Sequence, residues 1–159
     1  MPAPRKEARA ETTRAGLANL AGFRGNAIAA LICAIPDNSL ERIYILYPCP
    51  WPKTRHRKHR WYLHPVMPHL ARILAPQGVL IWASDQKFYI DEARFVCQKY
   101  YGLIPLCHGP ITPNAYNDLD RFPSGRTKFE RDFLERSMSC YELVVKKIET
   151  AVTESFVTI

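Results

Sequence analysis

The sequence predicts an α/β fold with a mostly parallel sheet. Two short segments, 42–47 and 79–83, are rich in β-branched and aromatic residues and apolar on both faces, as buried parallel strands are. Each is followed by a segment with helical periodicity, 65–74 after the first and 87–101 after the second. Alternating strands and helices favour a parallel sheet covered by helices.

The first part of the chain is expected to form short elements. Residues 1–15 alternate charged residues with alanine and predict a partial helix, and residues 19–24 predict a short strand. The apolar segment 26–34 predicts a short helix capped by Asn26, whose side chain can accept hydrogen bonds from the first free backbone amides. Pro-Asp-Asn-Ser at 36–39 predicts a turn.

The strand at 42–47 is expected to end at Pro48, because a residue before proline is restricted in its backbone conformation. Prolines recur at positions 50 and 52 and predict a stiff, extended loop at the carboxyl end of this strand. The helix that follows should end at Ala-Pro-Gln-Gly, residues 75–78.

The last third of the chain predicts two further strands. A strand is expected at 103–107, followed by a long loop at 109–125 that is rich in proline, asparagine and aspartate. Residues 127–136 predict a turn or short helix. The final strand is expected at 140–147, where apolar residues alternate.

Length and composition fit one soluble globular domain, residues 1–159. The hydrophobic content of 47% is enough for one core, and the charged content of 23% is ordinary. The net charge is +7 and is unevenly distributed. Five cations fall within eight residues: Lys53, Arg55, Arg57, Lys58 and Arg60. Such a basic cluster indicates an acidic partner: nucleic acid, an anionic membrane or an acidic protein.

Other patterns argue against a secreted, membrane or metal protein. The five cysteines are odd in number and lack C-x-x-C spacing, so we expect reduced thiols in a cytoplasmic protein. No apolar leader is visible near Met1, and the longest apolar run, 27–35, is far shorter than the roughly 20 residues of a membrane span. The histidines at 56, 59, 64 and 69 have no cysteine or carboxylate to complete a metal site, so none is expected.

The proline-rich loop and the basic run form one candidate site, residues 48–60. The prolines limit the loop's freedom, Trp51 offers a face on which a base can stack, and the cations can follow phosphates. The alternative is a solvated basic loop with a packing tryptophan.

A second candidate site is Ser84-Asp85, directly after the second buried strand. Asp85 can orient N–H groups of a substrate, or it can cap the helix that begins near Gln86. In parallel sheets, ligands bind beyond the carboxyl ends of the strands, so this site and loop 48–60 should face one crevice. Thr127 and Glu130 have the spacing of a capping box, and the residues alone favour this capping role.

These segments resemble motifs of the tRNA (guanine-N7)-methyltransferases. In that family a strand ends in F-x-D-P-W-P-K-x-R-H-x-K-R-R, and residues 47–60 read Y-P-C-P-W-P-K-T-R-H-R-K-H-R. Ser84-Asp85 stands at the family's T-D pair, and Thr127-Lys128-Phe129-Glu130 matches its T-x-F/Y-E. Gly25-Asn26-Ala27 is similar to the D-A pair at its adenosine pocket. The resemblance runs from about 17 to 147.

The resemblance implies a Rossmann-like methyltransferase sheet. It also implies transfer of a methyl group from S-adenosyl-L-methionine to N7 of a guanine in the variable loop of tRNA. The implied cofactor-binding residues are Asn26 and Ala27. The implied substrate-binding residues are Lys53, Arg55, His56 and Lys58 for the tRNA backbone, and Asp85, Thr127 and Glu130, which would help to hold the base and the cofactor.

The chain departs from the family pattern at two places. Cys49 occupies the position of the family's catalytic aspartate, and an ordinary thiol is mostly neutral at pH 7. Losing a charge-assisted hydrogen bond costs about 1.5–3 kcal/mol, so activity should fall at least about tenfold. The family's first two strands and Gly-rich turn are also missing. A truncated sheet would expose a strand edge that a second copy or a partner chain would cover. The alternative function is a non-catalytic tRNA-binding module or pseudo-enzyme subunit.

Overall fold

A computed structural model describes residues 26–148 of the chain. The chain divides into two compact units, 1–35 and 36–159. The partial helix expected at 1–15 and the strand expected at 19–24 lie outside the described residues. In the first unit, helix α2 (Ala27–Cys33) confirms the apolar helix expected there. Its cap is also confirmed, because Asn26 Oδ1 accepts hydrogen bonds from the backbone amides of the first turn at 2.9 and 3.3 Å.

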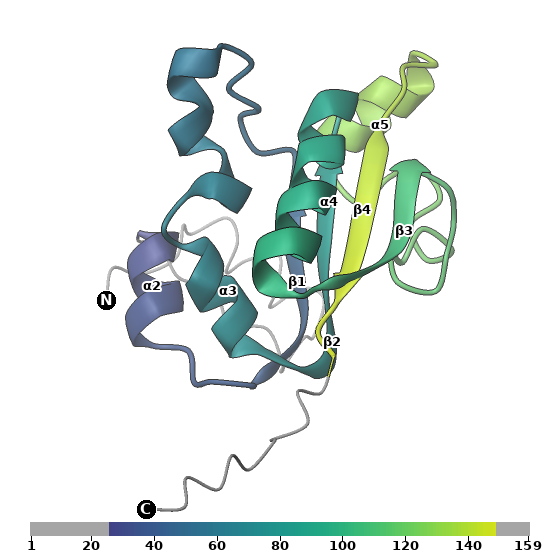
Figure 1. The fold of residues 1–159 in the computed structure, drawn as a ribbon. Helices are drawn as coiled ribbons and strands as arrows, with labels where there is room; N and C mark the ends of the chain where they lie inside the picture. Colours follow the sequence, from purple (N-terminus) through teal and green to yellow (C-terminus); the bar gives the residue numbers. More distant parts are fainter. Residues whose placement is uncertain (1–25, 149–159) are drawn as a thin grey trace, which may run out of the picture. The chain divides into compact units, whose positions relative to one another are not determined.

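The second unit is built on a four-stranded sheet in the order β1-β2-β4-β3 (Figure 1). The strands are β1 (Leu40–Leu46), β2 (Leu74–Ser84), β3 (Ile104–Pro110) and β4 (Tyr141–Lys146). β1 and β2 pair in parallel, whereas β4 pairs antiparallel with both β2 and β3. Three strands therefore run in one direction and β4 runs against them.

The prediction of a mostly parallel sheet is confirmed for the direction of β1, β2 and β3. It is wrong for β4, which pairs antiparallel with both of its neighbours. The connection from β3 to β4 spans residues 111–140 and contains helix α5 (Lys128–Glu135), so it is long enough for either strand direction. The direction of β4 is therefore not set by the length of its connection.

Two helices pack on this sheet. Helix α3 (Met67–Ile73) contacts β2, and α4 (Lys87–Tyr101) contacts β2, β3 and β4. The core between them contains Tyr62, Trp82 and Tyr89, which are fully buried, with the Tyr62 and Tyr89 rings 4.7 Å apart. Within residues 26–148, no helix is both long and apolar enough to cross a membrane.

Helix α3 ends before residues 75–78, as expected, but these residues belong to β2. Leu74 pairs with Leu40, but the register then shifts and Val79 pairs with Arg42. The intervening residues bulge out of the ladder. A Cβ on Gly78 would lie 2.8 Å from the carbonyl oxygen of Ala75, so this bulge requires glycine. The proline-glycine pattern at 75–78 therefore indicates a bulge within a strand.

Candidate functional site

The carboxyl ends of β1 and β2 and the start of β4 lie together. Tyr47, directly after β1, donates its backbone N–H to the carbonyl oxygen of Ala83 at 2.8 Å. Ser84, at the end of β2, pairs with Tyr141 of β4. Tyr47 has a φ of 54°, which turns the chain sharply away from the sheet. The two segments expected to face one crevice therefore do leave the same edge of the sheet.

Helix α5 joins this edge through Tyr47 and Glu130. The Tyr47 hydroxyl donates a hydrogen bond to Glu130 Oε2 at 2.9 Å, and the Tyr47 ring lies 4.7 Å from the ring of Phe129. Burial, together with nearby Cys140 and Glu130, raises the pKa of the Tyr47 hydroxyl. This hydroxyl therefore stays protonated and acts as a donor. Figure 1 shows α5 at this end of the sheet.

A buried guanidinium links α5 to β4. Arg126 donates to Glu130 through Nε at 3.2 Å and through Nη2 at 3.1 Å, and its Nη1 donates to Glu142 Oε2 at 2.6 Å. The three side chains are 0–5% exposed. Burial alone would lower the pKa of Arg126, but its bonds to the two carboxylates raise it. One cation is thus shared by two buried carboxylates.

The long loop before α5 is tied to the same group. The side-chain amides of Asn114 and Asn117 each donate to Glu142 Oε1 at 3.0 Å. On the β1 side, the Tyr44 hydroxyl donates to Asp118 Oδ2 at 2.5 Å. The loop is therefore fixed to the sheet at both β4 and β1, and it delivers Arg126 to the start of α5.

The structure tests the capping interpretation of Asp85. Helix α4 has Gln86 at its N-cap position and receives no side-chain capping bond. Asp85 Oδ2 accepts from the Gln86 side-chain amide at 2.6 Å, and Ser84 Oγ accepts from the Gln86 backbone N–H at 3.1 Å. The capping alternative for Asp85 is therefore wrong. Its carboxylate is half-buried at the tip of β2.

Thr127 and Glu130 complete only half of a capping box. Thr127 Oγ1 accepts from the Glu130 backbone N–H at 3.1 Å, which confirms the cap of α5. The Glu130 carboxylate binds Tyr47 and Arg126. It holds α5 against the end of β1.

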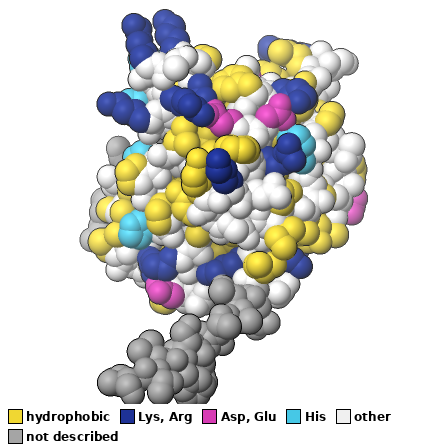
Figure 2. Space-filling view, viewed as in Figure 1, with side chains coloured by type: hydrophobic (Ala, Val, Ile, Leu, Met, Phe, Trp, Pro, Cys, Tyr) yellow, Lys and Arg dark blue, Asp and Glu magenta, His cyan; other side chains and the backbone are white. Residues whose placement is uncertain are grey.

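The basic loop continues into two short 3-10 helices, η1 (Thr54–His59) and η2 (Trp61–Leu63). Trp51 is half-buried, and its ring lies 5.5 Å from that of His56 and 5.1 Å from that of His59. Figure 2 shows Lys and Arg side chains gathered over this part of the molecule. Three of the predicted phosphate-binding residues are exposed and form no ion pair with a described residue: Lys53, Arg55 and Lys58.

Two cations of this loop are already paired. Arg57 and Arg60 both bind Glu92 of α4, and the Tyr62 hydroxyl donates to the same carboxylate at 2.9 Å. Partial burial would raise the pKa of Glu92, but hydrogen bonds from Arg57, Tyr62 and Arg60 lower it. The free charge of the loop is thus smaller than the sequence indicates.

Cys49 and the predicted cofactor residues are not part of this network. Cys49 is exposed. Asn26 and Ala27 belong to the first unit. Because Asn26 Oδ1 caps α2, only the amide nitrogen of that side chain is left for a ligand. Within residues 26–148 there is no Gly-rich turn, so the described residues fit at most one edge of a nucleoside pocket.

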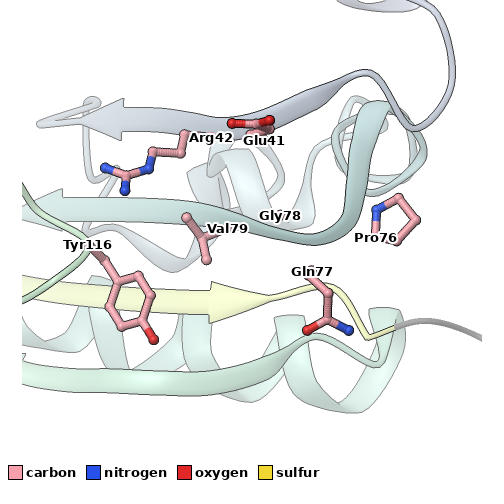
Figure 3. A pocket seen from close by; sticks show the side chains of 7 residues that line it. All are labelled: Glu41, Arg42, Pro76, Gln77, Gly78, Val79 and Tyr116. Carbon is pink, nitrogen blue, oxygen red and sulfur yellow. The ribbon is translucent and has the colours of Figure 1, made fainter.

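A cavity of about 340 Å³ lies beside the β2 bulge, at the opposite end of β1 and β2 from the candidate site (Figure 3). It is lined by Glu41, Arg42, Pro76, Gln77, Gly78, Val79 and Tyr116. No group of three or more histidine, cysteine or acidic residues in the described part of the chain could hold a metal ion.

Sequence reasoning missed Tyr47, Glu92, Arg126 and Glu142. Glu142 stands between the alternating apolar residues of β4, yet it is only 3% exposed. A carboxylate between the apolar residues of a central strand was the available signal, because a buried carboxylate requires a partner. No local pattern pointed to Glu92.

Comparison with known proteins defines the class. A family model described as "Putative methyltransferase" matches residues 5–143. The chain belongs to this methyltransferase family.

Curated relatives are named tRNA (guanine-N(7)-)-methyltransferase. The protein from Chlamydia caviae is 46% identical over 115 residues, which cover 72% of this chain and 48% of the relative. The protein from Alcanivorax borkumensis is 32% identical over 139 residues, which cover 86% of this chain and 55% of the relative. The chain spans about half the length of these two relatives.

Solved structures support the fold. A methyltransferase homolog from Pyrococcus horikoshii has a TM-score of 0.58 at 12% identity, covering 90% of this chain and 50% of that one. A geranyl diphosphate methyltransferase in complex with SAM has a TM-score of 0.50 at 13% identity, covering 87% of this chain and 62% of that one. The Rossmann-like methyltransferase fold expected from the sequence is confirmed.

Proposed function

We propose that the chain acts on tRNA as a guanine-N7 methyltransferase-like protein. In this proposal, loop 48–60 docks the tRNA and Asp85 receives a guanine of the variable loop. The observation that carries the proposal is that this loop and Asp85 leave the same edge of the sheet. The names of the curated relatives support both the reaction and the substrate.

The chemistry makes modest demands on the protein. N7 of guanine already carries a lone pair, so no base has to remove a proton from it. S-adenosylmethionine would supply an electrophilic methyl group. The protein has to orient the guanine and exclude water. Asp85 would accept hydrogen bonds from N1–H and N2–H and stabilise the positive charge that grows on the ring.

The remaining predicted site residues take supporting roles. Thr127 caps α5, and Glu130 fixes that helix to Tyr47 and Arg126, so both shape the side of the base pocket. Asn26 and Ala27 would lie at the adenosine of the cofactor. The tRNA backbone would bind the exposed Lys53, Arg55 and Lys58, together with the half-buried His56.

Cys49 favours a second candidate function, a non-catalytic tRNA-binding module or pseudo-enzyme subunit. An exposed thiol stands where the family has its catalytic aspartate. Such a subunit would bind tRNA and work with a second copy or a partner chain along the edge of the sheet at β1.

Calorimetric titration tests the catalytic proposal. The full chain is titrated with S-adenosylmethionine, and heat of binding that saturates below millimolar cofactor is expected. No heat at millimolar cofactor would rule out autonomous catalysis and favour the second function.

Salt dependence tests tRNA docking. Three phosphate contacts from Lys53, Arg55 and Lys58 predict a roughly 40-fold loss of tRNA affinity between 50 and 200 mM salt. Replacing all three by glutamine should abolish most of that dependence. If the wild-type chain does not bind tRNA at low salt, both functions are wrong.

A further inference from the structure

The Glu92 carboxylate accepts hydrogen bonds from Arg57 and Arg60 of the basic loop and from Tyr62 of η2. Arg57 Nε donates to Oε1 at 2.6 Å, Arg60 donates to Oε2 through Nη1, and the Tyr62 hydroxyl donates to Oε2 at 2.9 Å. The Glu92 side chain is 16% exposed and that of Arg60 is 7% exposed. Bonds between ionised groups with this little solvent contact are stronger and better oriented than surface ion pairs.

Arg60 connects Glu92 to the proline-rich segment. Its Nε and Nη2 donate to the carbonyl oxygen of Trp51 at 3.1 and 2.9 Å, and Nη2 also reaches that of Pro52 at 3.2 Å. Its guanidinium lies 5.1 Å above the Phe88 ring. Trp51 needs such support, because its φ of 46° is unfavourable for a non-glycine residue.

The contacts divide the loop's cations into two groups. Arg57 and Arg60 face Glu92 and α4. Lys53, Arg55 and Lys58 are exposed and form no ion pair with a described residue. Only Asp85 and Gln86 separate β2 from α4, so a loop fixed to α4 is also fixed relative to the end of β2.

We propose that Glu92 is the positioning residue of the tRNA-docking loop, holding Arg57 and Arg60 so that Lys53, Arg55 and Lys58 present a fixed array to phosphates. This inference rests on the proposed function and deepens it. It assigns different roles to neighbouring cations that the sequence alone treats alike. It also gives α4 a part in substrate recognition.

Electrostatics alone predicts the opposite result for Glu92. Replacing any carboxylate with an amide adds one positive charge and should tighten tRNA binding. Loss of positioning should weaken binding instead, because only the fraction of molecules with the ordered loop binds well. Glu92→Gln is therefore compared with Glu41→Gln, which makes the same charge change at an exposed site at the other end of β1.

The experiment measures tRNA affinity and trypsin cleavage of the free, full chain. For Glu92→Gln we expect about tenfold weaker tRNA binding, if the loop is ordered about a tenth of the time. We also expect faster cleavage confined to residues 53–60. Glu41→Gln should bind tRNA at least as tightly as the wild type, and Glu92→Asp should recover part of the lost affinity.

Three results separate the possibilities. If Glu92→Gln binds tRNA as tightly as Glu41→Gln with an equally resistant loop, the inference is overturned. Faster cleavage that extends to Arg121, in the distant exposed loop, would also overturn it by showing general unfolding. If the wild type binds no tRNA, the proposed function fails, and the cleavage pattern still decides whether Glu92 holds the loop.

Discussion

At the scale of single residues, Arg126 is the centre of the buried polar group. It compensates Glu130 and Glu142, and neither carboxylate has a second cation among the described residues. Removing one partner of a buried ion pair leaves an uncompensated charge in a medium of low dielectric constant. The group therefore fixes the loop before α5, the helix itself and β4 to one another.

Arg126→Met should destabilise the fold by about 3–5 kcal/mol, because it leaves two buried carboxylates unpaired. Urea unfolding followed by tryptophan fluorescence measures this change. Arg136→Met is the matched control, since Arg136 is exposed at the end of α5, and it should change stability by less than about 0.5 kcal/mol. Equal stabilities of the two variants would show that the buried group is not structural.

The sequence revealed single residues only where their role was local. Asn26 and Thr127 were both expected as helix caps, because capping depends on neighbouring residues in the chain. Arg126, Glu142 and Glu92 act through contacts between distant segments, which periodicity does not report.

At the scale of elements, the Thr127 cap stabilises the start of α5, where the motif residues lie. Thr127→Ala should lower stability by about 1 kcal/mol, because the Glu130 backbone N–H loses its acceptor. Amide exchange in residues 128–131 should accelerate, whereas Thr127→Ser should behave as the wild type. Unchanged exchange in Thr127→Ala would mean that the buried bonds of Glu130, and not the cap, hold the helix start.

Helices were predicted better than strand pairing. The expected helix 87–101 is α4 to the residue, since its apolar spacing is regular and Gly102, with a φ of 61°, ends it. The bulge at 75–78 and the antiparallel direction of β4 depend on which strands become neighbours. That choice is made by packing across the sheet, which short segments do not encode.

At the scale of the whole molecule, the topology explains why the motifs meet. Parallel β1 and β2 bring the basic loop and Asp85 to one edge, as the rule for ligand sites in α/β sheets predicts. The predicted cofactor residues Asn26 and Ala27 belong to the other compact unit. The meeting of the basic loop and Asp85 was thus predictable from the sequence, whereas the roles of these residues and of Asn26 and Ala27 stay predictions.

The position of a transferred methyl group tests the central claim most directly. The full chain is incubated with unmodified tRNA and S-adenosylmethionine, and N7-methylguanine is located by borohydride reduction and aniline cleavage of the tRNA. The account predicts cleavage at a guanine of the variable loop. The reaction should be slow with Cys49 and about tenfold or more faster with Cys49→Asp. Absence of cleavage with both chains, under conditions in which they bind tRNA, would contradict the account and leave a tRNA-binding module.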